Sequence, residues 1–220
     1  MSPQVNILIP VSLPDWWKET AISRYRTHAG ADTLITGSAF TSAQQEEADG
    51  GGLADVLLEN AREAEEAGAG AHVIDCFGDP KMLELAARLR RPVTGVGHSA
   101  MHFAHAFAKS YAIITGESAG VSEILGNASR YGVDARLTAC LAVEISAAQI
   151  PDRKEDALDR LESLTMGMGT PPEWIVLGCT ELAELAPQLE ARLRRRGIGT
   201  RVLNPLIATT RWAEAAAQAF

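Results

Sequence analysis

Cysteine is scarce in this sequence, and the three that occur are isolated. Cys76, Cys140 and Cys179 form no CxxC pair. A disulfide framework is therefore excluded, and neither Cys76 nor Cys179 has a neighbour at the spacing of zinc ligands. We expect a reduced, cytoplasmic protein that holds no metal.

Long apolar runs and basic stretches are missing as well. No run approaches the roughly 20 apolar residues of a membrane-spanning helix, and no basic segment precedes an apolar one at the N-terminus. The formal charge of -8 argues against nucleic-acid binding. Because 46% of the residues are hydrophobic and 22% charged, the composition is typical of a globular protein. We expect a small-molecule substrate, with no nucleic acid or membrane as partner.

The chain alternates short apolar runs with helical patterns. Strands are predicted at residues 5–9, 72–75, 92–96, 111–115, 137–140, 174–177 and 201–203. Helices are predicted at residues 53–67, 81–90, 99–109, 118–131, 154–164, 183–195 and 206–218. Continuous apolar strands that alternate with helices indicate parallel sheets covered on both faces.

Two segments of the first half recur in the second. VNILIPVS (5–12) is similar to YAIITGES (111–118), and HVIDCFGDP (72–80) to WIVLGCTEL (174–182). Both pairs are separated by just over a hundred residues. The repeat predicts two similar α/β halves, each with a cysteine at the carboxyl end of an equivalent strand, where open α/β sheets bind ligands. Two such halves facing each other would place the thiols on opposite walls of one cleft.

A cysteine between a strand and a helix suits proton transfer. The unpaired N–H groups and the dipole at a helix start favour the thiolate. Asp79 and Pro80 have the pattern of an N-cap and a first helical residue, and Thr180 and Glu181 are placed to begin the helix after Cys179. A thiolate and a thiol on opposite faces of a carbon would remove a proton from one face and return one to the other.

These motifs resemble the aspartate/glutamate/hydantoin racemase superfamily. The segment at 75–104, with its Cys-Phe-Gly-Asp-Pro run, is similar to the hydantoin racemase branch. The segments IVLGCTELAEL (175–185) and NPLIATTRWAE (204–214) resemble the second cysteine motif and the C-terminal helix of the superfamily. The resemblance implies two pseudo-symmetric Rossmann-like lobes with mainly parallel sheets and an active site in the cleft between them. One lobe would be residues 1–96 plus 205–220, the other residues 97–204.

The resemblance also implies an isomerase that works without a cofactor and assembles as a homo-oligomer. Cys76 and Cys179 match the catalytic pair. Hydroxyl and backbone N–H groups would hold the substrate oxygens. By position, these substrate-binding residues are Ser12, Thr41, Ser42, Phe77, Gly78, Thr115, Gly116 and Thr180. The turn at residues 10–14 and the GCTEL motif depart from the hydantoin branch, and the second is closer to the amino-acid racemases.

Simpler interpretations stand beside some of these assignments. Cys140 has no turn after it, which favours structural burial. Thr41 and Ser42 either bind substrate or cap a helix, because Ser42 and Gln45 have the spacing of a capping box. His98, His102 and His105 share a helical face and lack a carboxylate for a metal site. His98 follows the predicted strand end at Gly97, so it either contacts substrate or is a partly buried surface residue.

The sequence therefore predicts a cofactor-independent racemase, with 5-substituted hydantoins as the favoured substrates. The alternatives within enzymes are an aspartate or glutamate racemase and an allantoin- or maleate-type isomerase. The alternative outside enzymes is a small-molecule binding protein on the same scaffold.

Overall fold

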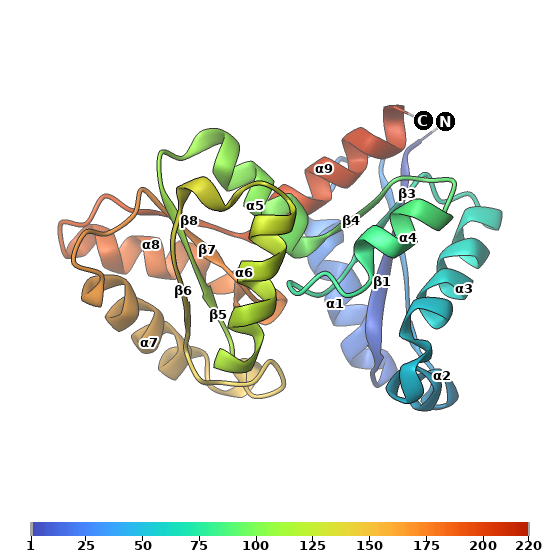
Figure 1. Ribbon diagram of the computed structural model, residues 1–220, viewed down its shortest axis with the longest axis horizontal. Coiled ribbons are helices and arrows are strands. Elements are labelled where there is room, and N and C mark those ends of the chain that lie inside the picture. The colour runs from blue at the N-terminus through green and yellow to red at the C-terminus, as the bar shows by residue number, and fades with distance from the viewer. Residues whose placement is uncertain (1, 220) are drawn as a thin grey trace. The chain divides into compact units, whose positions relative to one another are not determined.

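A computed structural model describes residues 2–219, and the chain divides into two compact units (Figure 1). Unit 1 comprises Met1–Val96 and Leu206–Phe220, and unit 2 comprises Gly97–Pro205. Each unit holds one sheet of four parallel strands.

Unit 1 has the strand order β2-β1-β3-β4. Its strands are β1 (Gln4–Ser12), β2 (Leu34–Phe40), β3 (Ala71–Ile74) and β4 (Val93–Gly95). Its helices are α1 (Asp15–His28), α2 (Ser42–Glu47), η1 (Ala48–Gly52), α3 (Leu53–Glu66), α4 (Met82–Arg88) and α9 (Pro205–Ala219). From β1, the chain adds β2 on one side and then β3 and β4 on the other. With right-handed crossovers, this change of direction places helices on both faces of the sheet.

Unit 2 repeats this order as β6-β5-β7-β8. Its strands are β5 (Tyr111–Thr115), β6 (Leu137–Ala142), β7 (Trp174–Leu177) and β8 (Arg201–Leu203). Its helices are α5 (Val96–Phe107), η2 (Ser118–Gly120), α6 (Val121–Arg130), η3 (Asp134–Arg136), η4 (Ile150–Asp152), α7 (Lys154–Gly167), η5 (Thr180–Leu185) and α8 (Ala186–Arg195). The equivalences β1–β5 and β3–β7 follow from the identical order.

The two sheets also agree in register. Leu8 pairs with Ile74 at the end of β3, and Ile114 pairs with Leu177 at the end of β7. The prediction of two similar α/β lobes with parallel sheets is confirmed.

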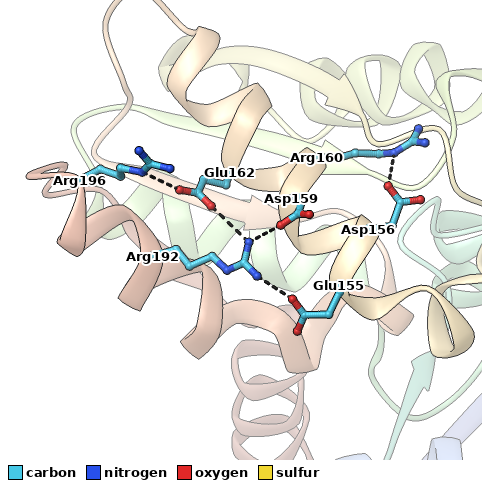
Figure 2. A network of polar contacts seen from close by, with 7 residues as sticks. All are labelled: Glu155, Asp156, Asp159, Arg160, Glu162, Arg192 and Arg196. Carbon is cyan, nitrogen blue, oxygen red and sulfur yellow. Dashed lines mark hydrogen bonds and ion pairs between the residues drawn. The ribbon is translucent and has the colours of Figure 1, made fainter.

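One face of the unit 2 sheet is covered by α7 and α8. Buried side chains from β5 and β7, among them Ile114 and Leu177, pack with Leu161 of α7 and Leu189 of α8. Charged residues join the outer surfaces of the same helices: Arg192 of α8 pairs with Glu155, Asp159 and Glu162 of α7, and Glu162 also pairs with Arg196 (Figure 2). Helices α7 and α8 are thus held together by apolar packing on the side facing the sheet and by ion pairs on the outer side.

The predicted elements do not include α1 or β2. The structure buries only Ala21, Ile22 and Tyr25 of α1, too few for a clear apolar periodicity. Strand β2 carries Thr36, Gly37 and Ser38 in its centre, where a strand pattern normally has apolar residues. Within residues 2–219, no helix combines the length and the apolar character needed to cross a bilayer.

Candidate active site

Cys76 lies in a tight turn directly after β3. The N–H of Asp75 donates to the Leu8 carbonyl of β1 at 2.9 Å, which prolongs the sheet by one bond. The N–H of Cys76 then donates to the Ile74 carbonyl at 2.9 Å, and the N–H of Asp79 donates to the Cys76 carbonyl at 3.1 Å. The Cys76 side chain is half-buried at this carboxyl edge of the sheet.

The prediction that Asp79 caps the next helix is wrong. Helix α4 begins at Met82, and its N-cap position is Lys81, with a left-handed φ of 61°. Asp79 is itself left-handed, at φ 49°, and its buried carboxylate packs on the end of β4. A Cβ on Gly95 would lie only 1.9 Å from Asp79 Oδ1, so this contact requires glycine at position 95. A tertiary contact thus replaces the cap, and α4 starts beyond the cysteine turn.

The residue before Cys76 is held by a side chain from α1. The Tyr25 hydroxyl donates to Asp75 Oδ1 at 2.6 Å, and Tyr25 is buried. Burial first, and then the Asp75 carboxylate, raise the pKa of Tyr25 well above its usual value, and the nearby Cys76 contributes in the same direction. Tyr25 therefore stays protonated as a donor at neutral pH. Sequence reasoning missed it, because no local pattern links α1 to the turn.

Cys179 occupies the equivalent turn in unit 2. The N–H of Gly178 donates to the Ile114 carbonyl at 2.8 Å, and the Thr115 hydroxyl donates to the Gly178 carbonyl at 2.7 Å. Cys179 is half-buried at the N-cap position of η5, which begins at Thr180 as the sequence predicts. A Cβ on Gly178 would lie 2.6 Å from Ile113 Cγ2, so glycine is required here too.

The hydroxyl residues of unit 1 meet at the ends of β1 and β2. Ser12 pairs with Phe40, the last residue of β2, and its N–H donates to Gln45 Oε1 of α2 at 2.8 Å. The capping box predicted for Ser42 and Gln45 is wrong by one residue: Thr41 is the N-cap and forms the box with Gln44. Gln45 is engaged with Ser12 instead. Ser42 begins α2.

The remaining predicted residues lie at the two cysteine turns and, for Thr115 and Gly116, at the end of β5. In unit 1, Phe77 is buried and Gly78 half-buried directly after Cys76. In unit 2, Thr115 is buried, and the Gly116 carbonyl accepts the Ile145 N–H at 3.0 Å. Thr180 is half-buried at the first position of η5.

His98 is not at a strand end. Strand β4 ends at Gly95 and α5 begins at Val96, so His98 lies in the first turn of a helix. Its ring lies 4.3 Å from that of His102 and 5.0 Å from that of Tyr131, centroid to centroid. Burial first, and His102 second, lower the pKa of His98 to about 4. His98 is therefore neutral at pH 7 and offers a hydrogen bond rather than a charge.

The other histidines of α5 and the third cysteine have different surroundings. His102 Nδ1 lies 2.9 Å from the His98 carbonyl oxygen, and His105 Nδ1 lies 3.2 Å from that of Val133. Across residues 2–219, no group of three or more His, Cys, Asp or Glu side chains is placed to hold a metal ion. Cys140 lies within β6, and burial raises its pKa to about 11, so it remains a thiol.

Comparison with known proteins gives the family. The family model described as Asp/Glu/Hydantoin racemase matches residues 19–213, and the chain belongs to this family. The hydantoin racemase of Pseudomonas sp. (strain NS671) is 25% identical over 160 residues. That match covers 72% of this chain and 62% of the relative, so the chain spans less than two thirds of that protein.

Two solved structures have the same fold. The allantoin racemase from Klebsiella pneumoniae gives a TM-score of 0.82 at 25% identity, covering 99% of this chain and 89% of that one. The glutamate racemase from Thermus thermophilus gives a TM-score of 0.69 at 20% identity, covering 99% and 81%. The predicted membership of the racemase superfamily is confirmed.

Proposed function

We propose that this protein is a cofactor-independent racemase that inverts the carbon next to a carbonyl, with 5-substituted hydantoins as substrates. Cys76 and Cys179 would be the acid/base pair. The observation that carries the proposal is their equivalence: each follows the same strand of its sheet after a turn built on the same backbone bond, to Leu8 in one case and Ile114 in the other. The named relatives add support, because allantoin is itself a hydantoin substituted at C5.

The proposed reaction needs only proton transfers. One cysteine, as thiolate, takes the C5 proton and becomes a thiol, while the electron pair delocalises onto the adjacent carbonyl oxygen. The other cysteine, as thiol, gives its proton to the opposite face of C5 and becomes a thiolate. The C5 proton of a hydantoin is more acidic than the α-proton of an amino-acid carboxylate, so modest stabilisation of the enolate suffices.

Donor groups at the carboxyl ends of the strands would stabilise the enolate oxygen. We assign this role to the hydroxyl and backbone groups of Ser12, Thr41, Ser42, Phe77, Gly78, Gly116 and Thr180. The Thr115 hydroxyl already donates to the Gly178 carbonyl, so Thr115 would support the Cys179 turn instead. His98, neutral at pH 7, would add a hydrogen bond without introducing a charge.

The test follows an L-5-alkylhydantoin in deuterated water by NMR and polarimetry, with a no-enzyme control for spontaneous exchange. The wild-type protein should lose optical rotation while deuterium enters C5. Cys76→Ala and Cys179→Ala should each slow inversion by about 10³-fold, the scale of losing an acid/base group. Cys140→Ala is the matched control and should keep the wild-type rate, because Cys140 lies within a strand.

Residual exchange sharpens the test. A variant with one thiol can still remove a proton and return deuterium to the same face. Any exchange left in Cys76→Ala should therefore be confined to one enantiomer, and in Cys179→Ala to the other. Inversion that persists in both variants would contradict the two-thiol mechanism. If the wild-type protein is inactive on hydantoins but active on aspartate, glutamate or maleate, hydantoins are not its substrates and the class of the active compound replaces them. Binding without exchange would favour a binding protein.

A further inference from the structure

The two cysteine turns share their backbone but differ at the residue before the thiol. Asp75 and Gly178 hold equivalent positions, since their N–H groups donate to Leu8 and Ile114. Unit 1 therefore places a carboxylate beside its cysteine. Unit 2 has no side chain there and no room for one, because even a Cβ at Gly178 would meet Ile113 Cγ2 at 2.6 Å.

The carboxylate beside Cys76 is engaged from a distant element. Tyr25 lies 50 residues earlier in the chain, and its hydroxyl donates to Asp75 Oδ1 at 2.6 Å. The Tyr25 side chain is 1% exposed, so this bond forms away from bulk water. Hydrogen bonds to a charged acceptor in such surroundings are short and strong. The bond therefore fixes the orientation of Asp75 and disperses its charge.

Burial and the Asp75 carboxylate are the main causes of the raised pKa of Tyr25, and charge on Cys76 adds a smaller effect in the same direction. Arg24 of α1 acts on the pKa of Tyr25 in the opposite direction. Asp79, a second carboxylate, is buried in the same turn, where its N–H donates to the Cys76 carbonyl.

We propose that Tyr25 and Asp75 form a positioning pair that sets the reactivity of Cys76 and makes it different from Cys179. This inference deepens the proposed function and rests on it for its catalytic meaning. The Asp75 carboxylate opposes a second negative charge on the adjacent sulfur. The Tyr25 hydroxyl weakens that opposition by drawing the charge toward itself. Cys179 follows Gly178, so the residue before it contributes neither a carboxylate nor a partner for a tyrosine hydroxyl.

Two conservative variants separate the charge from the hydrogen bond. Tyr25→Phe removes the hydroxyl and leaves the carboxylate. Asp75→Asn removes the charge and leaves a carbonyl oxygen that can accept from Tyr25. The proposal requires opposite effects: the Cys76 thiolate should be less populated in Tyr25→Phe and more populated in Asp75→Asn.

The measurement is the rate at which iodoacetamide alkylates each cysteine across a neutral pH series, read by peptide mass spectrometry. The thiolate displaces iodide and forms the new C–S bond, so the rate reports the thiolate fraction. We expect Cys76 to react about three- to tenfold more slowly in Tyr25→Phe, the scale of an ordinary net hydrogen bond, and faster by a similar factor in Asp75→Asn. The Cys179 rate should stay unchanged in both.

Tyr111→Phe is the matched control. Tyr111 is as buried as Tyr25, but its hydroxyl donates to the Val133 carbonyl at 2.7 Å in unit 2. Loss of this hydroxyl should leave both alkylation rates at their wild-type values, with folding checked by thermal unfolding. The proposal is overturned if Tyr25→Phe leaves the Cys76 rate unchanged, if Tyr25→Phe and Asp75→Asn change that rate in the same direction, or if the Cys179 rate changes with the Cys76 rate.

Racemisation supplies the second readout. A positioning pair should lower kcat about tenfold in Tyr25→Phe with KM nearly unchanged, because the pair acts on the thiol and not on the substrate. Alkylation requires no substrate, so the two proposals fail separately. A wild-type protein without racemase activity would overturn the proposed function, while the alkylation rates still decide whether Tyr25 and Asp75 control Cys76.

Discussion

The two cysteine turns reach the same backbone geometry by different means. In unit 1, side chains from other elements hold the turn: Tyr25 binds Asp75, and Asp79 packs on Gly95. In unit 2, the backbone itself is packed: Gly178 lies against Ile113, and the Thr115 hydroxyl binds the Gly178 carbonyl. The first turn therefore uses the carboxylates of Asp75 and Asp79, while the second uses a close apolar contact and a neutral hydrogen bond.

Under the proposed function, this difference would let a repeated fold serve two chemical roles. Each thiol follows the equivalent strand of its sheet, and the proposed positioning pair would make the residue before the thiol the source of the difference. A racemase needs two groups that alternate between acid and base, and unequal surroundings give them unequal resting states. The comparison is testable, because each turn depends on contacts that the other lacks.

The largest effect should come from filling the packed turn of unit 2. In Gly178→Ala, the new Cβ would lie 2.6 Å from Ile113 Cγ2 and 3.3 Å from the Ile114 carbonyl oxygen. The turn must move away from β5 and break its bond to Ile114. We expect a loss of about 2 kcal/mol in the free energy of unfolding by urea, and racemisation reduced by at least about 100-fold.

Gly126→Ala is the control for this change. Gly126 lies in α6, and a Cβ there meets nothing within 4 Å. Alanine in an open helical position should stabilise the protein by about 0.5–1 kcal/mol. If Gly178→Ala behaves like Gly126→Ala, the packed-turn description of unit 2 is wrong.

The same contrast explains which parts of the site could be predicted from sequence. Both cysteine turns follow apolar strands, a local pattern that is visible without the fold. Tyr25 could not be found, because its partner is 50 residues away and α1 shows little apolar periodicity. The Asp79-Pro80 pair gives a valid helix-start pattern, but the contact with Gly95 outweighs it. Local signals located the thiols, whereas the groups that act on them depend on tertiary contacts.

The second-largest effect should be a loss of stability in acid that is greater in unit 1 than in unit 2. His72 of β3 is fully buried, and burial lowers its pKa despite the Glu65 carboxylate 3.7 Å away. Below a pH of about 6.5, His72 binds a proton in the unfolded chain but not in the folded protein, where its pKa is lowered. Acid therefore favours the unfolded state and destabilises unit 1. For Glu65, burial raises the pKa, but hydrogen bonds from Arg91 and Arg90 outweigh it and the net pKa is lowered. Protonation of Glu65 at still lower pH acts in the same direction.

Hydrogen exchange provides the measurement. After correction for the intrinsic pH dependence, amides of β3 should lose about 1 kcal/mol of protection for the first pH unit below about 6.5. Amides of β7 should lose less. His72→Leu removes the titrating group and should abolish the difference in this range. Equal losses in both strands, or an unchanged difference in His72→Leu, would contradict the assignment to His72.

The smallest effect concerns the surface of unit 2, where Arg192 joins α8 to three carboxylates of α7 (Figure 2). Arg192→Met keeps the alkyl stem and removes the ion pairs. Because Glu155 and Asp159 are largely exposed, we expect a loss of no more than about 1 kcal/mol in urea unfolding. High salt should shrink that loss further. Arg194→Met, which breaks only an exposed pair with Glu190 within α8, should cost less than half as much. If the Arg192 effect is equal to that of Arg194 and independent of salt, the network contributes nothing beyond a single exposed pair, and unit 2 relies on its apolar packing alone.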